Sequence, residues 1–220
     1  MALTIDARVR DRFPELDIRI SSLKGVKVER SYLELESFKE EVFKEISENY
    51  NLETLKDVDI FRAYRDFFWR AGIDPTKTRP AAEALIRRVL AGRPIPKINS
   101  LVDAYNLASI KTGIALAAFD EDELKGDLTA RFAEPGEEFL GIGMTEPVKL
   151  KGGEIVIADE EKLIAIYPYR DSEQTMITDS TRNVLLMICG VPNVDQETLH
   201  RAEDTAVEYI VRFCGGRRQQ

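Results

Sequence analysis

Three small polar side chains recur on one predicted helix. Asn99, Asp103 and Asn106 are spaced by four and then three residues, so on a helix they share one face. The helix is otherwise largely apolar, and polar groups in such a setting need partners inside the fold or on a ligand. We therefore regard this stripe as a candidate ligand-binding surface.

A second polar group lies between two predicted strands, from Arg170 to Thr181. Its candidate ligand-binding residues are Arg170, Asp171, Ser172, Thr178 and Thr181. A guanidinium group with several hydroxyls suits a carboxylate, a phosphate or a ribose. The structural alternative is a polar surface loop held by bonds from Ser and Thr side chains to the nearby backbone.

The formal net charge of −8 conceals a basic segment. Residues 61–97 hold nine basic and three acidic side chains. Such a patch can hold a polyanion locally even on an acidic protein. The candidate RNA-binding residues in it are Arg79, Arg87, Arg88, Arg93 and Lys97. The alternative is a solvated helix face.

Standard catalytic and metal-binding motifs are missing from the sequence. It has no GxGxxG after a strand, no GxxxxGK[ST], no HExxH and no GxSxG. With His200 as the single histidine, a His-rich metal site and a catalytic pair of imidazoles are excluded. Cys189 and Cys214 lie far apart without a CxxC pattern, so we expect reduced thiols. No metal and no cofactor are expected.

The chain offers no segment for a membrane. No apolar run approaches the roughly 18 to 20 residues that a membrane helix needs, and the first residues lack the features of a signal peptide. We therefore expect a cytoplasmic protein without membrane contact. The sequence gives no indication of the oligomeric state.

The helices expected to position these residues come mostly in the first half of the sequence, and the strands mostly in the second half. Helical periodicity predicts helices at about 6–13, 34–48, 57–71, 80–90, 99–111 and 195–213. Strands are predicted at about 16–23, 114–119, 127–133, 139–142, 146–149, 154–158, 163–167 and 183–190. The tail from Gly215 onward is expected to be frayed. This order favours an α+β (α/β-like) fold with a mixed sheet and flanking helices. We interpret residues 1–220 as a single domain, with an N-terminal strand and helix extension at 1–60 and a core at 61–213.

Short motifs between about Arg79 and Ile188 occur in a family-like order and spacing. They are Arg93-Pro94-Ile95, Asn99-Ser100-Leu101-Val102-Asp103 with Tyr105-Asn106, Gly113 ahead of Ala118-Phe119-Asp120, and Thr181-Arg182-Asn183-Val184-Leu185-Leu186. In these motifs the chain resembles the B3/B4 domain of the phenylalanyl-tRNA synthetase β chain, and more closely the free-standing B3/B4-domain proteins. The resemblance implies the fold of that domain. It also implies an editing pocket, which in the synthetase hydrolyses tRNA charged with tyrosine in place of phenylalanine.

The residues of that pocket carry over only in part. The resemblance places the family's pocket asparagine at Asn106 and its aspartate at Asp103. Where the family has a histidine this chain has Ala117, and where the family has a glutamate it has Met187. The family's Gly-rich loop is replaced by residues 169–172. These departures remove the groups that would orient water and recognise a tyrosine hydroxyl, so a pocket in the same place would be rebuilt around Asn106, Arg170 and Asp171.

Three functions fit these observations. The first is a free-standing RNA-binding protein, directed at tRNA, that may act as a trans-acting hydrolase of mischarged aminoacyl-tRNA. The second is a non-catalytic protein that binds a small amino-acid-like ligand or a protein partner. The third is a retained fold with a structural or interaction role. Whether the protein is an enzyme stays open, and its only general-base candidates are Asp103 and Asp171.

Overall fold

The computed structural model describes residues 1–30 and 33–219. Its helices are α1 (Ala7–Arg12), α2 (Leu33–Asn49), α3 (Asp59–Arg70), α4 (Ala81–Leu90), α5 (Ser100–Thr112) and α6 (Gln196–Cys214), with 3-10 turns η1 (Leu55–Asp57), η2 (Glu121–Glu123) and η3 (Glu173–Thr175). Its strands are β1 (Leu3–Ile5), β2 (Ile18–Lys24), β3 (Ala115–Asp120), β4 (Leu128–Phe132), β5 (Glu138–Phe139), β6 (Val148–Lys149), β7 (Ile155–Ala158), β8 (Leu163–Ile166), β9 (Arg170–Asp171), β10 (Asn183–Cys189) and β11 (Arg217–Arg218). The predicted α+β class, with a mixed sheet and flanking helices, is confirmed.

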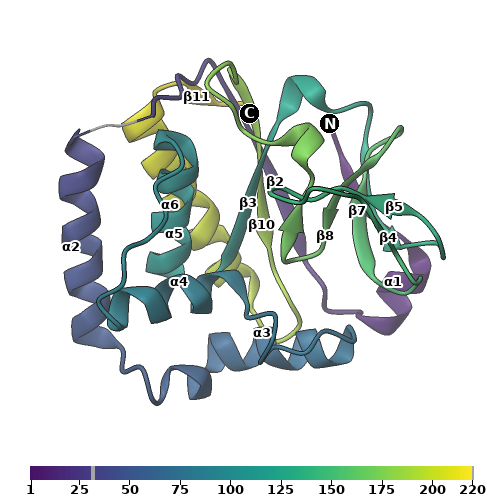
Figure 1. Ribbon diagram of the computed structural model, residues 1–220, viewed down its shortest axis with the longest axis horizontal. Coiled ribbons are helices and arrows are strands. Elements are labelled where there is room, and N and C mark those ends of the chain that lie inside the picture. The colour runs from purple at the N-terminus through teal and green to yellow at the C-terminus, as the bar shows by residue number, and fades with distance from the viewer. Residues whose placement is uncertain (31–32, 220) are drawn as a thin grey trace.

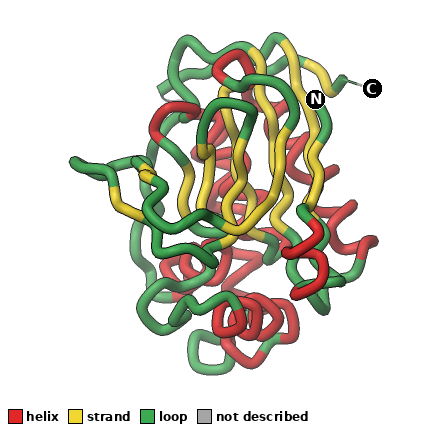
Figure 2. The backbone as a smooth tube through the Cα atoms, turned by 90° about the vertical axis from the view of Figure 1, so that its right-hand side faces the viewer, coloured by secondary structure: helices red, strands yellow, loops and turns green. Residues whose placement is uncertain are grey.

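Most strands belong to two sheets that lie side by side in Figure 1. One sheet has the order β11-β2-β10-β3 and is antiparallel throughout. The other has the order β1-β4-β7-β8-β9 and is mixed, because β1 runs parallel to β4 while the later pairs are antiparallel. β5 and β6 form a separate pair. In Figure 2, which is turned by 90° from Figure 1, most strands lie in front of most helices.

Helices cover the outer face of the four-stranded sheet. α5 and α6 pack against each other beside β10 and β2, and α2 lies outside α5, as Figure 1 shows. Asn99 precedes α5 with an extended backbone and caps it, because its side chain accepts a hydrogen bond from the Val102 amide at 2.9 Å. α5 ends at Gly113, which adopts a left-handed φ of 74° and closes the helix with a conformation that glycine tolerates best.

α3 supplies a cluster of aromatic side chains to the core. Phe61, Tyr64, Phe67 and Phe68 are buried, as their helical spacing predicts. Trp69 lies on the outer face and is 57% exposed. The core is continuous from these rings to both sheets and to the inner faces of α5 and α6.

The prediction of a frayed tail was wrong for residues 215–219, and Gln220 lies outside the described residues. β11 pairs with β2, and Arg218 forms ion pairs with Glu203 and with Asp204, the latter at 3.1 Å. Strands β1, β9 and β11 were also not predicted. Each has only two or three residues, too few to show an alternating apolar pattern, and backbone pairing with a neighbour forms them.

Among the described residues, no helix has the length and apolar character needed to cross a bilayer.

Candidate functional site

A small pocket lies where the two main sheets face each other. We call it the inter-sheet pocket, and its volume is about 70 Å³. The four-stranded sheet contributes one wall and the five-stranded sheet with the segment after β8 contributes the other, while α4 contributes its first residue. The lining residues are Ala81, Leu116, Ala117, Ala165, Ile166, Tyr167, Pro168, Tyr169, Asp171, Met187 and Cys189.

β9 places Asp171 in this pocket. Asp171 is paired with Ala165 of β8, so both side chains lie on one face of the sheet. Its carbonyl oxygen accepts a hydrogen bond from the Ile142 amide at 2.9 Å. Arg170, one residue earlier, is exposed, because successive side chains of a strand point to opposite faces. The backbone therefore fixes which of the two charged side chains enters the pocket.

The environment of Asp171 alters its acidity. Burial raises the pKa of its carboxyl group to about 7, against the weaker opposing attraction of Arg170. The side chain is only partly exposed, and its carboxyl group has no hydrogen-bond or ion-pair partner among residues 1–30 and 33–219. A carboxyl group with a pKa near neutrality can both accept and donate a proton at physiological pH. Such a group facing a pocket is typical of a functional residue.

α5 contributes a second group close to this carboxyl. Burial raises the pKa of Tyr105, and the charges of Asp171 and Asp103 raise it further. The phenol therefore stays neutral and can serve only as a hydrogen-bonding group. Tyr105 is not one of the residues that line the pocket.

The opposite wall of the pocket is apolar. Met187 of β10 is paired with Ala117 of β3, and Cys189 with Ala115. Burial raises the pKa of the Cys189 thiol well above its usual range, so this cysteine stays a protonated, unreactive wall residue. The Tyr64 hydroxyl donates to the Cys189 carbonyl at 2.5 Å and accepts from the Ala115 amide at 3.0 Å, which ties the ends of the two strands together.

Two of the three polar residues predicted to share a helix face, Asn99 and Asp103, form hydrogen bonds within the protein. Asn99 caps α5, and Asp103 accepts from the Lys39 ammonium at 2.7 Å and from the Ile98 amide at 3.1 Å. Lys39 is buried and its pKa is raised, because bonds to Asp103 and Glu36 outweigh the lowering effect of burial. Asn106 is partly buried and lines none of the cavities described here.

Most of the predicted loop residues also bond within the protein. Thr181 donates to the Asp120 carboxylate at 2.6 Å and accepts from the Thr178 amide at 2.9 Å. Ser172 caps η3 by accepting from the Gln174 amide at 3.2 Å. The Arg170 side chain lies against Gly141 and donates to the Ile142 carbonyl at 3.4 Å. Of the eight predicted ligand-binding residues, only Asp171 lines the inter-sheet pocket.

A larger hollow of about 390 Å³ lies beside β5 and β7. Two ion pairs line it, Arg131 with Glu137 at 2.6 Å and Lys162 with Asp159 at 2.7 Å. Burial alone would raise the pKa of Asp159, but bonds from Lys162 and from three backbone amides lower it. The remaining carboxyl groups of the lining, on Glu138, Glu160 and Glu161, belong to exposed residues and thus differ from Asp171.

The basic segment is largely engaged in internal bonds. Glu83 is fully buried and binds Arg65 at 2.9 Å and Arg87 at 2.7 Å. The Arg88 guanidinium donates to the Pro94 carbonyl. Lys97 pairs with Glu36 at 2.5 Å.

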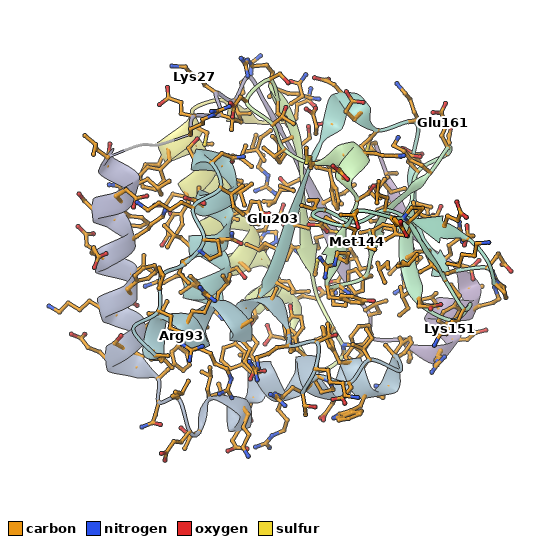
Figure 3. All side chains as sticks on the ribbon, in the orientation of Figure 1. Lys27, Arg93, Met144, Lys151, Glu161 and Glu203 are labelled. Carbon is orange, nitrogen blue, oxygen red and sulfur yellow. The ribbon has the colours of Figure 1, made fainter. Side chains whose placement is uncertain are left out.

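Two of the predicted RNA-binding residues remain available. Arg79 and Arg93 are exposed and have no bonded partner in the described part of the chain. Arg79 lies two residues before Ala81, which lines the inter-sheet pocket. The two arginines lie at opposite ends of α4, and Arg93 is labelled in Figure 3.

Sequence analysis identifies this pocket only in part. The family resemblance predicts polar residues at the positions of Ala117 and Met187, and both line the cavity. Pro168, Ala165 and Cys189 carry no chemical signal of their own. Among the described residues, no group of three or more His, Cys, Asp or Glu side chains is arranged to hold a metal ion.

Comparisons with known proteins agree on one family. The model of the B3/4 domain matches residues 63–215. A phenylalanine–tRNA ligase beta subunit from Fusobacterium nucleatum is 37% identical over 91 residues, which is 41% of this chain and 11% of that protein. Its counterpart from Pectobacterium atrosepticum is 28% identical over 162 residues, which is 63% of this chain and 20% of that protein. The chain thus spans a tenth to a fifth of the length of these curated relatives.

A solved structure shows the same fold. It is an N-terminal fragment of the phenylalanyl-tRNA synthetase beta-subunit from Pyrococcus horikoshii, which superposes with a TM-score of 0.53 at 15% identity. The superposition covers 99% of this chain and 50% of that chain.

Proposed function

Because this chain belongs to the B3/4 domain family, we propose that it binds charged tRNA and hydrolyses the aminoacyl ester in its inter-sheet pocket. Its matched relatives are named as ligases that act with tRNA. The observation that carries the proposal is Asp171: an unpartnered carboxyl group with a pKa of about 7 that faces a pocket between two sheets.

Asp171 has the properties of a general base for ester hydrolysis. When ionised, its carboxylate accepts a proton from a water molecule while the water oxygen attacks the acyl carbonyl carbon. The carbon–oxygen bond to the ribose then breaks, and the departing ribose oxygen takes up the proton held by Asp171. The products are a free amino acid and uncharged tRNA, and Asp171 returns to its starting state.

An exposed arginine supports a polyanionic substrate at this place. Arg79 lies two residues before Ala81, the α4 residue that lines the pocket, and its side chain has no bonded partner among the described residues. Its guanidinium group is therefore free to contact a phosphate beside the pocket. With such a contact, binding weakens as salt concentration rises.

The test is deacylation of one tRNA charged in turn with different amino acids. We expect release of the amino acid above the spontaneous rate for at least one of them. The isosteric change Asp171→Asn removes the base, and we expect the rate to fall at least about 100-fold. The matched control is Glu173→Gln, an exposed carboxylate two residues further along, which we expect to hydrolyse at the normal rate. Survival of every charged tRNA would overturn the hydrolytic function.

A second candidate function is binding without catalysis, to a small amino-acid-like ligand. It is favoured by the lack of an imidazole in the pocket: His200 lies on α6, 62% exposed at its side chain, with Nδ1 at 2.6 Å from the Arg19 guanidinium. A ligand that binds only the folded state raises the melting temperature. Stabilisation by free amino acids, together with stable charged tRNA, would favour this function.

A further inference from the structure

The inter-sheet pocket is small for an aromatic ring. Its volume is about 70 Å³, whereas an engineered apolar cavity that accepts benzene measures about 150 Å³. A ring could enter only if the two sheets separated, and protein interiors are packed too tightly to yield by so much without loss of contacts. The space suits a side chain of a few carbon atoms.

The walls match an aliphatic group. Ala117, Ala165 and Met187 provide carbon and thioether surfaces, and all three are at most 6% exposed. The hydroxyl of Tyr167 is already bonded to the Gly190 carbonyl. A polar side chain entering this part of the pocket would lose its hydration without gaining a partner, which is costly.

One group of the pocket is suited to a cation. The Asp171 carboxyl lacks a bonded partner among the described residues, although it lies among buried neighbours. Burial destabilises its charged form, and an incoming ammonium group would stabilise that form. An α-ammonium group at Asp171 and a short side chain against Ala117 and Met187 would therefore occupy the pocket together.

We propose that the inter-sheet pocket selects α-amino acyl groups with small aliphatic side chains, of the size of alanine to valine, and excludes phenylalanine and tyrosine. One oxygen of the Asp171 carboxylate binds the α-ammonium group and the other stays open to the attacking water, while Ala117 and Met187 limit the length of the side chain. This selectivity rests on the proposed function for its biological setting, but the binding step can be tested separately from hydrolysis.

The test uses amino acid amides, which carry the ammonium and the side chain but no ester. Binding of alaninamide, valinamide, phenylalaninamide and tyrosinamide is measured by calorimetry, and the methyl signal of Met187 in NMR spectra reports whether the ligand reaches the pocket. We expect valinamide or alaninamide to bind at least about tenfold more tightly than either aromatic amide. N-Acetylvalinamide lacks the ammonium and should not bind.

Variants that make the pocket smaller or larger test whether its volume limits the size of the ligand side chain. Ala117→Leu fills the pocket and should abolish binding of valinamide. Met187→Ala enlarges it and should admit phenylalaninamide, and Met187→Leu, of similar volume, should keep the original order. Melting curves establish that each variant is folded, and Met187→Val replaces Met187→Ala if the latter does not fold.

The outcomes separate this proposal from the proposed function. Aromatic amides binding as tightly as aliphatic ones, or no amide binding at all, would overturn the selectivity. If the expected order of amides is found but every charged tRNA survives, the selectivity stands and the hydrolytic function fails.

Discussion

At the scale of single residues, the chemistry of the inter-sheet pocket depends on the charge of Asp171. Its pKa of about 7 lies well above the ordinary value of 3.8 because protein atoms surround the carboxyl group. Just below neutrality the group is mostly protonated and donates a hydrogen bond. Just above, it is mostly an anion that accepts a proton or binds a cation. A ligand or a small change in pH therefore selects its state.

The first prediction at this scale concerns stability. Between pH 3.8 and about 7 the folded state keeps the Asp171 proton while the unfolded state releases it, so stability falls as pH rises through this window. Above pH 7 the full cost of a buried charge remains. We expect Asp171→Asn to raise the free energy of unfolding by about 2–4 kcal/mol at pH 8 and by little at pH 4. Urea unfolding at the two pH values measures the difference. An equal effect at both would contradict the raised pKa.

The second prediction concerns activity. If ionised Asp171 is the base, the rate of hydrolysis at tRNA concentrations well below saturation, which reports the free protein, rises with pH and levels off above about 7. Spontaneous ester hydrolysis also rises with pH, so rates are taken as differences from the rate without protein. Asp171→Asn should flatten the profile, whereas Glu173→Gln should leave its midpoint unchanged.

At the scale of elements, a buried ion pair joins α2 to α5. Lys39 and Asp103 are each 7% exposed at the side chain, 2.7 Å apart, and Lys39 also binds Glu36 at 2.7 Å. Removing one partner of such a pair leaves the other charge buried and alone, which costs more than the pair itself contributes. α2 lies outside the other helices in Figure 1, so this pair is a principal polar attachment of the helix.

The prediction at this scale concerns the contribution of the Lys39–Asp103 ion pair to stability. We expect Lys39→Met to lower the free energy of unfolding by about 3–5 kcal/mol, measured by urea unfolding. The double variant Lys39→Met with Asp103→Asn removes the unpaired negative charge of Asp103 and keeps an acceptor for the Ile98 amide. It should therefore recover part of the lost stability. Lys44→Met, at an exposed position on α2, is the control and should change stability by less than about 0.5 kcal/mol. A loss in Lys39→Met no larger than in the control would show that the pair does not hold α2.

The helix stripe shows how far sequence reasoning reaches at this scale. Spacing correctly placed Asp103 and Asn106 on one helix, and Gly113 at its end, but Asn99 precedes the helix with an extended backbone and caps it. Spacing could not reveal that Lys39, more than sixty residues earlier, donates to Asp103, because periodicity describes one helix and not what packs against it. The number of polar groups around Asp171 marks that residue, while its neighbours Ala165 and Pro168 are recognisable only from the folded pocket.

At the scale of the whole molecule, the internal bonds of the basic segment reduce the surface that can contact RNA. Arg65 of α3 and Arg87 of α4 both bind Glu83 of α4, and the Arg65–Glu83 pair joins the two helices. Arg79 and Arg93 remain exposed. The number of charges can be read from the sequence, but the sequence does not distinguish charged side chains that bond within the fold from those that face solvent.

The prediction at this scale concerns salt dependence. Replacing Arg79 and Arg93 together by Ala should weaken tRNA binding and reduce the slope of log K against log salt by about 2, because each phosphate contact contributes about one unit. Filter binding at several salt concentrations measures the slope. Replacing Lys149 and Lys151 by Ala is the control of equal charge: both are exposed, and Lys151 lies across the molecule from Arg93 in Figure 3. Equal slopes for the two double variants would show that net charge alone governs binding.

The pairing of Met187 with Ala117 across β10 and β3 has a consequence for how this protein can diverge. Leu186 and Ile188 alternate with Met187 along β10, so their side chains lie on the opposite face of the sheet from Met187. In Figure 1, α5 and α6 lie on the side of this sheet away from β7 and β8. Under the proposed selectivity, substitutions at the two paired positions alone would change which side chains fit the pocket, while the packing between this sheet and the helices stays the same.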